Sequence, residues 1–403
     1  MSRDRYAEDI IASPKKERLP FVILGSVALL GKLTGIGHYT RQLIMAIRQN
    51  ELVADLKMWG DVGFLRSGVL DRLEHEFDSP NRSENPKASL KTTFRQSASR
   101  SYLATLLYSA VTERVAAHRL APLAKDHVYH SPNYILPRFE GPKVITIHDL
   151  SVIRFPQFHR KQMVKICEQG IRRAIDEQAQ MIVDSDLVGR ELIGDFGVSE
   201  ERITTVHLAP DERCRPRSEV ECRETLDRSG LKYKTFFLSV GTIEPRKNLL
   251  RLFEAYRAGR QAGLFDWPLV VVGAPGWKLE REYEALRELC ADGFALYLGY
   301  VSDAELHMLY SSAGALVFPS LYEGFGLPVA DALASGCRVI TSEQTAMAEF
   351  ADGHAALVDP LDCRSIMKAM HSASKADTTF APVAVGRQWC DVAEETVAVY
   401  SQA

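Results

Sequence analysis

Residues 236–256 read FFLSVGTIEPRKNLLRLFEAY, in which an apolar run leads through a glycine-containing turn into a run with helical periodicity. Phe236–Val240 predicts a buried strand, because it is short, apolar and bounded by a glycine. Lys247–Tyr256 predicts a helix. A strand, a short turn and a helix form the repeating unit of parallel α/β sheets, whose two faces are covered by helices.

The same alternation continues towards the C-terminus. The expected strands are Leu269–Val272, Ala295–Leu298, Ala315–Phe318 and Val339–Thr341. The expected helices are Glu280–Leu289, one that begins at Ser302, Pro328–Ala334 and those within Ser365–Ala403. Pro328 suits the first turn of a helix, and Gly336 suits the position just beyond its end.

The N-terminal half has a similar pattern. Its expected strands are Phe21–Gly25, Val128–Tyr129, Val144–Ile147, Met181–Val183 and Ile203–Val206, and its expected helices are Tyr39–Arg48 and Gln162–Glu177. Residues 208–234 break the alternation with charge and two prolines, so the linker is placed at Pro210–Pro216. We therefore expect an α/β fold of two tandem Rossmann-like domains that face a central cleft, where ligands of such sheets bind.

Length and composition narrow the class of protein. The 403 residues suit two domains of about 200 residues each. A net charge of −3 argues against a general nucleic-acid binder, so no nucleic-acid partner is expected. The seven cysteines form no CxxC pair and no zinc spacing, which is typical of a reducing compartment. Residues 1–18 lack a signal-peptide pattern, and the apolar run at 21–30 is too short to span a bilayer, so we expect a cytoplasmic protein.

Arg246 and Lys247 form the first candidate site. They follow Gly241 in the turn between a predicted strand and helix. Free backbone N–H groups and the helix dipole favour anions at such a position, and the two cations add to them. Arginine can hold phosphate oxygens with a bidentate fork, and lysine acts as a point charge. A solvated pair of cations is the alternative.

The loop Tyr322–Pro328 forms the second candidate site. Its two glycines, Gly324 and Gly326, allow a ligand to approach the backbone closely. Glu323 can accept hydrogen bonds from sugar hydroxyls, and Asp331 lies eight residues later on the following helix. The alternatives are a glutamate that interacts with the helix dipole and an aspartate in a local salt bridge.

Two further candidates lie in the N-terminal half. Gly35-Ile36-Gly37 precedes the helix Tyr39–Arg48, and an ordinary tight turn would explain it equally. His148 lies in Thr146-Ile147-His148-Asp149-Leu150, at the end of a predicted strand. There it can bond to a ligand hydroxyl or, alternatively, to neighbouring backbone.

Together these segments resemble the retaining glycosyltransferases of family 4, which have the GT-B fold. The resemblance is strongest over residues 237–360. Ser239–Asn248 is similar to the family's diphosphate-binding segment, and Pro319–Pro328 matches its hallmark loop. Gly299–Ser302 is similar to the segment whose backbone meets the nucleobase. The resemblance implies an N-terminal acceptor domain, residues 1–212, completed by a C-terminal helix at 385–403, and a nucleotide-sugar donor domain, residues 213–384.

The resemblance also implies roles for individual residues. The family's hallmark is two glutamates separated by seven residues; the first contacts the donor sugar and the second the ribose, and here Asp331 stands at the second position. Ser185 resembles a serine of the cleft, although Val188 replaces its usual second serine. The implied catalytic residues are His148, Glu323, Arg246 and Lys247. The implied donor-binding residues are Gly35, Gly37, Ser185, Gly241, Arg246, Lys247, Tyr300, Val301, Glu323, Gly324, Phe325, Gly326, Leu327 and Asp331.

The expected function is retaining transfer of a hexose, mannose from GDP-mannose or a related GDP-sugar, to a lipid-linked or polysaccharide glycan such as an O-antigen. A UDP-glucose donor and a GT-B non-transferase, such as a nucleotide-sugar epimerase or a phosphorylase, remain alternatives. No DxD-type acidic cluster appears in a metal-binding context, so no metal or other cofactor is expected. A dinucleotide-dependent oxidoreductase is disfavoured because Thr40 stands where G-x-G-x-x-G requires glycine. A catalytically dead binding module is disfavoured by the intact candidate site.

The segment 87–125 carries seven cations and one acid, with apolar and aromatic residues between them. A basic amphipathic stretch of this kind can lie on anionic lipid, which would place the protein at the inner face of the membrane. A charged helix face whose apolar side packs in the domain core is the alternative.

Overall fold

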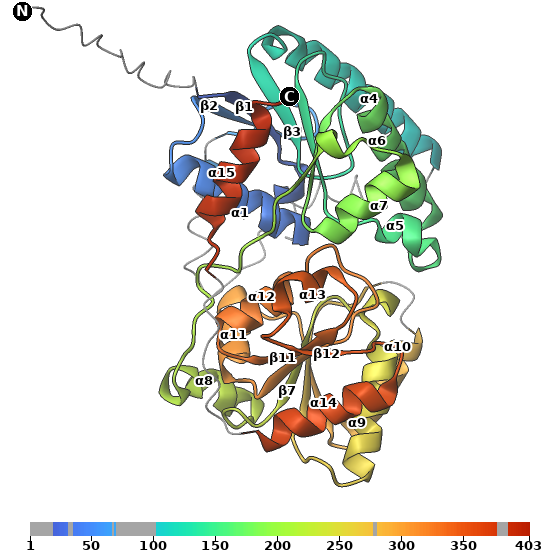
Figure 1. Ribbon diagram of the computed structural model, residues 1–403, viewed down its shortest axis with the longest axis vertical. Helices are drawn as coiled ribbons and strands as arrows, with labels where there is room; N and C mark the ends of the chain where they lie inside the picture. The colour runs from blue at the N-terminus through green and yellow to red at the C-terminus, as the bar shows by residue number, and fades with distance from the viewer. Residues whose placement is uncertain (1–18, 31–34, 67, 70–101, 277–279, 377–385) are drawn as a thin grey trace, which may run out of the picture.

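The computed structural model describes residues 19–30, 35–66, 68–69, 102–276, 280–376 and 386–403. Two α/β domains are stacked one above the other (Figure 1). Each contains a six-stranded parallel sheet, which confirms the expected fold class.

The N-terminal sheet has the strand order β2-β1-β3-β4-β5-β6. Its strands are β1 (Phe21–Gly25), β2 (Asp55–Trp59), β3 (His127–Ser131), β4 (Lys143–Ile147), β5 (Gln180–Val183) and β6 (Ile203–Thr205). Its helices are α1 (Gly35–Gln49), α4 (Tyr102–Leu120), α5 (Ser151–Arg154), α6 (Lys161–Asp176) and α7 (Asp186–Phe196). Alternate residues of each strand face opposite sides, so Val22 and Leu24 pack beneath α1, whereas Ile23 packs with residues of α4 and α7.

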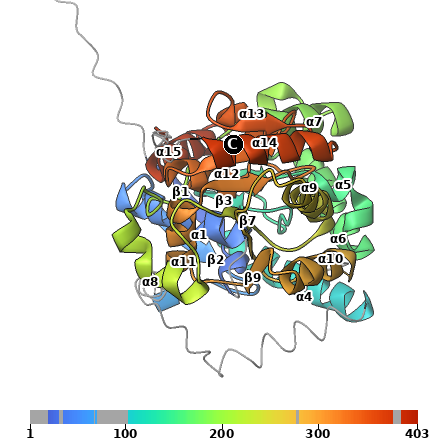
Figure 2. The ribbon, with the colours of Figure 1, turned by 90° about the horizontal axis from the view of Figure 1, so that it is seen from below.

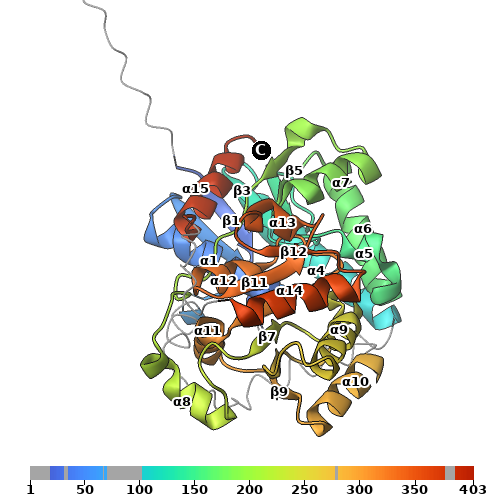
Figure 3. The ribbon, with the colours of Figure 1, turned by 60° about the horizontal axis from the view of Figure 1, so that its bottom comes forward.

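The C-terminal sheet has the order β12-β11-β10-β7-β8-β9. Its strands are β7 (Phe237–Val240), β8 (Leu269–Val272), β9 (Ala295–Gly299), β10 (Ala315–Phe318), β11 (Arg338–Ser342) and β12 (Ala356–Val358). Its helices are α8 (Glu219–Ser229), α9 (Leu249–Gln261), α10 (Glu280–Ala291), α11 (Asp303–Ser312), α12 (Leu327–Ala334), α13 (Ala346–Ala351) and α14 (Cys363–Lys375). Figures 2 and 3 show α9 and α10 on the opposite side of β7 from α8 and α11, and each side contributes its own apolar core.

The last helix, α15 (Trp389–Tyr400), returns to the N-terminal domain, where it lies beside α1 (Figure 1). Trp389 and Tyr400 are buried in the same apolar cluster as Tyr39 and Leu43 of α1. A chain of buried polar groups also joins α15 to the sheet. The Tyr400 hydroxyl lies 2.8 Å from His130 Nδ1, His130 Nε2 lies 2.8 Å from the Thr146 hydroxyl, and Thr146 lies 3.1 Å from the Tyr39 hydroxyl.

Several local expectations were wrong. Two edge strands, β2 and β12, were not predicted, because β2 carries two charged residues in five and β12 has only three residues. Helix α1 begins at Gly35, so the pair Gly35 and Gly37 lies within its first turn and not in a loop before it. The expected helix Lys247–Tyr256 is instead a short 3-10 turn, Pro245–Lys247, followed by α9 from Leu249.

None of the helices in the described part of the chain combines the length and apolar character needed to cross a bilayer. Of the basic segment 87–125, residues 87–101 lie outside the described residues. Helix α4 follows, and its Ala116 and Leu120 are buried in the N-terminal core. At these two residues, packing against the domain core is therefore observed.

Candidate functional site

A buried ion cluster joins the turn after β7 to the loop after β10. Arg246 Nη1 donates to Glu323 Oε2 at 2.7 Å, and Lys247 Nζ donates to Glu323 Oε1 at 2.7 Å. Arg246 Nη2 donates to Glu244 Oε1 at 2.8 Å. The side chains of Arg246, Lys247 and Glu323 are 14%, 13% and 10% exposed. The two predicted cations and the predicted glutamate therefore meet in one site, and the alternative of a solvated cation pair is wrong.

The charges in this cluster determine the ionisation of Glu323. Burial by itself would raise the pKa of its carboxyl, but the neighbouring Arg246 and Lys247 lower that pKa to about 2. Glu323 is therefore a carboxylate at neutral pH. Arg246 has a raised pKa, because the attraction of Glu323 outweighs the effect of burial. Its buried Nε–H finds no acceptor among the described residues, although its Nη groups are bonded.

Unusual backbone conformations hold the two segments together. Gly241 has φ 132°, and Asn248 is left-handed with φ 60°, which asparagine tolerates better than most residues. The Asn248 side chain donates to the carbonyl oxygens of Pro319 and Pro360 at 3.0 and 2.7 Å. Asn248 was not predicted as a site residue; its signal was an asparagine directly before a helix in the turn that carries the cations.

The hallmark loop packs against the N-terminal domain at Gly324. A Cβ atom placed on Gly324 would lie 1.7 Å from the backbone oxygen of His148 and 3.0 Å from Asp149 Cβ. No side chain fits at Gly324 while the domains are in this arrangement. Gly326 has φ 106°, and a Cβ there would lie 2.5 Å from Met347 Cγ. The two glycines thus serve different purposes, a contact between domains and a left-handed turn before α12.

His148 is held by two acceptors of its own domain. Its Nδ1 lies 2.7 Å from Asp184 Oδ2, and its Nε2 lies 3.0 Å from the Pro132 carbonyl oxygen. Because a carboxylate and a carbonyl only accept, both ring nitrogens must carry hydrogen. Burial acts to lower the pKa of His148, but the Asp184 carboxylate and these bonds raise it above its usual value. The predicted contact of His148 with a donor sugar remains a prediction, and Asp184, which follows β5, was not predicted.

Asp331 lies on α12 and faces the interdomain linker. Its Oδ1 accepts the backbone N–H of Asp211 at 2.9 Å. Burial, reinforced by the negative charge of Asp211, raises the pKa of Asp331 to about 7. The predicted contact with a ribose would involve this carboxyl, which ionises near neutral pH.

We expect Asp331→Asn to remove the contribution of this carboxyl to the pH dependence of the free energy of unfolding. Between about pH 4 and pH 7 the folded protein holds a proton that the unfolded chain has released, so its free energy of unfolding falls as pH rises. This contribution is at most about 4 kcal/mol, and solvent reduces it at a partly exposed carboxyl. Urea unfolding at pH 4.5, 6 and 8 measures the difference between wild type and Asp331→Asn. Parallel curves for the two proteins would contradict the raised pKa.

The other predicted donor-binding residues lie around this centre. Ser185 is buried at the start of α7, where its hydroxyl accepts the Val188 N–H at 3.4 Å and caps the helix. Tyr300 follows β9 and is 42% exposed, and Val301 packs against the C-terminal core. Phe325 stacks on Phe350 with ring centroids 4.4 Å apart. The side chain of Leu327 is partly buried against the same core cluster as Phe325, so the polar groups that these two residues offer to a ligand are those of the backbone.

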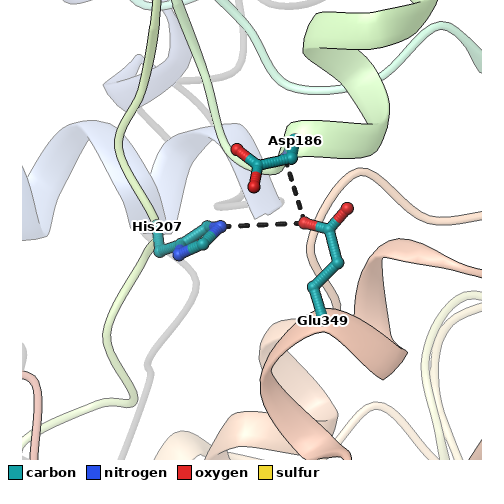
Figure 4. Close-up of side chains that lie close together, drawn as sticks. All are labelled: Asp186, His207 and Glu349. Atoms are coloured by element: carbon teal, nitrogen blue, oxygen red, sulfur yellow. Dashed lines mark hydrogen bonds and ion pairs between the residues drawn. The ribbon is translucent and has the colours of Figure 1, made fainter.

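A second contact between the domains lies at the N-terminus of α7 (Figure 4). Glu349 of α13 accepts the N–H groups of Asp186 and Leu187 at 2.9 and 2.8 Å, and His207 Nε2 lies 3.7 Å from Glu349 Oε2. Burial acts to raise the pKa of Glu349, but His207 and the two N–H groups lower it overall. A carboxylate at this position is stabilised by the helix dipole, and here the helix belongs to the other domain.

Within the described residues, Asp186, His207 and Glu349 form a group whose ligand atoms lie close enough together to hold a metal ion. Both oxygens of Glu349 already accept backbone hydrogen bonds, so the arrangement is that of a helix cap. The predicted independence of metal remains a prediction.

Comparison with known proteins links this site to one family. Residues 223–378 match the family model described as glycosyl transferases group 1. The chain is 31% identical to O-antigen chain mannosyltransferase B of Escherichia coli over 345 residues, which is 86% of this chain and 88% of that protein. It is 24% identical to O-antigen chain mannosyltransferase RfbU of Salmonella typhimurium over 57% of this chain and 60% of that protein. A glycosyltransferase structure from Rickettsia africae superposes with a TM-score of 0.59 at 13% identity, over 94% of this chain and 93% of that one.

Proposed function

Because the chain belongs to the group 1 glycosyl transferases, with the GT-B fold of family 4, we propose that it transfers mannose from GDP-mannose, or from a related GDP-sugar, with retention. The acceptor in this proposal is a lipid-linked or polysaccharide glycan. The proposal draws the sugar from the relatives, which are named as mannosyltransferases of O-antigen chains. Residues 213–384 would bind the donor, and residues 1–212 with 385–403 would bind the acceptor.

The observation that carries the reaction is the buried cluster of Arg246, Lys247 and Glu323 beneath the contact with the N-terminal domain. The cations would hold the donor diphosphate, and an oxygen of this anion would supply the acceptor that Arg246 Nε–H does not find among the residues that the structure describes. Lys247 keeps N–H groups beyond the one it donates to Glu323. Glu323, held as a carboxylate, would accept hydrogen bonds from hydroxyls of the sugar.

In the proposed mechanism the bond between the sugar and the phosphate breaks with positive charge at the anomeric carbon and negative charge on the departing diphosphate. Fixed positive groups at the diphosphate lower this barrier, by roughly 3–4 kcal/mol per important donor in other enzymes. The leaving phosphate oxygen accepts the proton of the acceptor hydroxyl, and that hydroxyl attacks from the same face. The product therefore keeps the anomeric configuration, and an inverted product observed by NMR would contradict this path.

A panel of nucleotides tests the donor. We expect GDP at a hundred times its dissociation constant to raise the free energy of unfolding by about 2.7 kcal/mol, and UDP, ADP and NAD to give smaller shifts at the same concentration. Thermal unfolding measures the shift. A shift specific to UDP would replace the donor with a UDP-sugar such as UDP-glucose, and a shift with NAD alone would contradict a transferase. Turnover of the nucleotide sugar without a glycan acceptor would favour an epimerase.

We also propose that the protein works at the cytoplasmic face of the membrane, where a lipid-linked acceptor would be found. The charge of the segment 87–125 supports this contact, since each cation near anionic lipid contributes about 1 kcal/mol. Co-sedimentation with vesicles, with and without anionic lipid, tests it. Binding that does not depend on anionic lipid would contradict the proposed contact with the membrane.

A further inference from the structure

Tyr322, the residue before Glu323, reaches from the C-terminal domain into the N-terminal domain. Its side chain is buried, with 6% of the residue exposed. The hydroxyl donates to Glu191 Oε2 at 2.5 Å and accepts the backbone N–H of Leu150 at 3.0 Å. Its ring centroid lies 5.7 Å from that of Phe155. All three contacts cross from one domain to the other.

The two polar partners of Tyr322 are fixed within the N-terminal domain. Glu191 lies on α7 with its side chain 11% exposed, and its other oxygen, Oε1, lies 3.1 Å from Arg154 Nε. Leu150 is buried and follows Asp149, whose neighbour His148 contacts Gly324. The hydroxyl of Tyr322 therefore bridges α7 and the segment that follows β4.

On the side of its own domain, Tyr322 is bonded to the cation cluster. Its carbonyl oxygen accepts from Arg246 Nη1 at 2.8 Å, and the N–H of the preceding Leu321 donates to the Arg246 carbonyl at 2.9 Å. The backbone of Leu321 and Tyr322 thus makes two hydrogen bonds to Arg246, while the side chain of Tyr322 contacts the N-terminal domain. The hydroxyl's bond to a carboxylate is of the strong, charge-assisted kind.

We propose that Tyr322 is a positioning residue that couples closure of the two domains to the placement of Arg246 and Glu323. This inference rests on the proposed transfer reaction, which needs the donor enclosed between the domains, but not on the identity of the nucleotide sugar. Domain closure excludes water and completes the set of reacting groups. When the Tyr322 hydroxyl is bound by Leu150 and Glu191, the hallmark loop lies against His148, and Arg246 is held by the same loop.

Tyr322→Phe tests the proposal, with Tyr256→Phe as a matched control. Tyr256 is also buried, and its single O–H donates to carbonyl oxygens of its own domain, with Phe294 O at 2.7 Å and Trp267 O at 3.0 Å. We expect Tyr322→Phe to lower kcat roughly tenfold, the size of one lost charge-assisted bond. The KM for donor and the Kd for nucleoside diphosphate should change less than about threefold. Tyr256→Phe should leave kcat within about twofold.

Hydrogen exchange supplies a readout that needs no substrate. The Leu150 N–H is bonded to the hydroxyl of Tyr322 across the domain contact, so a peptide covering residues 148–155 should exchange several-fold faster in Tyr322→Phe and not in Tyr256→Phe. Faster exchange in this peptide supports the proposed role of Tyr322, and unchanged exchange overturns it. If the wild type transfers no sugar from any nucleotide donor, the proposed function fails, while this exchange experiment still decides the inference.

A double-mutant cycle with Glu191→Gln tests whether Tyr322 and Glu191 act through their shared hydrogen bond or independently. If Tyr322 and Glu191 act through one bond, the double variant should lose little more kcat than Tyr322→Phe alone. Losses that multiply would show that the residues act separately and would overturn the proposal.

Discussion

Arg246→Ala is expected to lower kcat/KM by about 100- to 1,000-fold, the loss found when one preorganised electrostatic donor is removed from other active sites. The guanidinium holds Glu323, Glu244 and the Tyr322 carbonyl, and in the proposed reaction it also holds the departing diphosphate. Removing the guanidinium takes away the positive charge and the hydrogen bonds that position the loop of Tyr322 and Glu323. Steady-state kinetics with the nucleotide sugar measures the loss, and the stabilisation by the matching nucleoside diphosphate should fall with it.

Arg257→Ala is the matched control for this variant. Arg257 lies on α9 and pairs with Glu288 at 3.1 Å on the surface, where such a pair contributes little. The Arg257→Ala variant should keep kcat/KM within about twofold of the wild-type value. Arg246→Lys should recover only part of the loss, because lysine keeps the charge without the bidentate geometry. If Arg246→Ala retained more than a tenth of the wild-type kcat/KM while folded, the role given to the diphosphate site would be wrong.

Gly324→Ala should reduce kcat at least 100-fold and leave nucleotide binding to the C-terminal domain largely intact. The added methyl group would lie 1.7 Å from the His148 carbonyl oxygen, so the two domains cannot meet as they do here. The backbone of Gly324 is not in the left-handed region, so the substitution is compatible with the loop itself. Single-turnover kinetics and nucleotide titration separate the two effects, because closure is needed for transfer and not for first contact with the nucleotide.

Gly194→Ala provides the comparison. Gly194 lies in α7, and a Cβ there meets nothing within 4 Å. Alanine should stabilise that helix slightly without changing kcat, because glycine is a poor helix former. Wild-type kcat in Gly324→Ala would mean that transfer proceeds without the contact between the hallmark loop and His148.

The fold was predictable because buried parallel strands leave a strong local pattern. Runs such as Leu269–Val272 and Ala315–Phe318 are fully buried, so their sequences are apolar throughout, and the structure places strands there. The edge strands β2 and β12 were missed for the converse reason: an edge strand needs less apolar sequence and can be short. The start of α9 was missed because the left-handed conformation of Asn248 separates the cations from the helix.

The candidate site was predictable only in part. Arg246, Lys247 and Glu323 stand in segments with recognisable patterns, and the structure brings them together. The acids that surround this centre carry no local pattern. Asp184, which bonds to His148, and Glu191, which bonds to Tyr322, are single acids among many, and Glu349, which accepts the N–H groups at the start of α7, lies on a short helix. The contacts of Glu191 and Glu349 depend on how the two domains meet, which the alternation of strands and helices within each domain does not specify. Ser185 shows the same limit, since a serine after a strand serves equally as a helix cap.

The return of α15 to the first domain has a consequence for the synthesis of the chain. The ribosome releases the N-terminal sheet early, but Trp389 and Tyr400, which pack with α1 and of which Tyr400 bonds to His130, are made only after the whole C-terminal sheet. Until then the apolar surface that these residues cover stays open, although N-terminal domains usually fold first. Completion of the first domain must wait for the whole of the second. Premature termination between the C-terminal sheet and α15 would therefore damage the N-terminal domain.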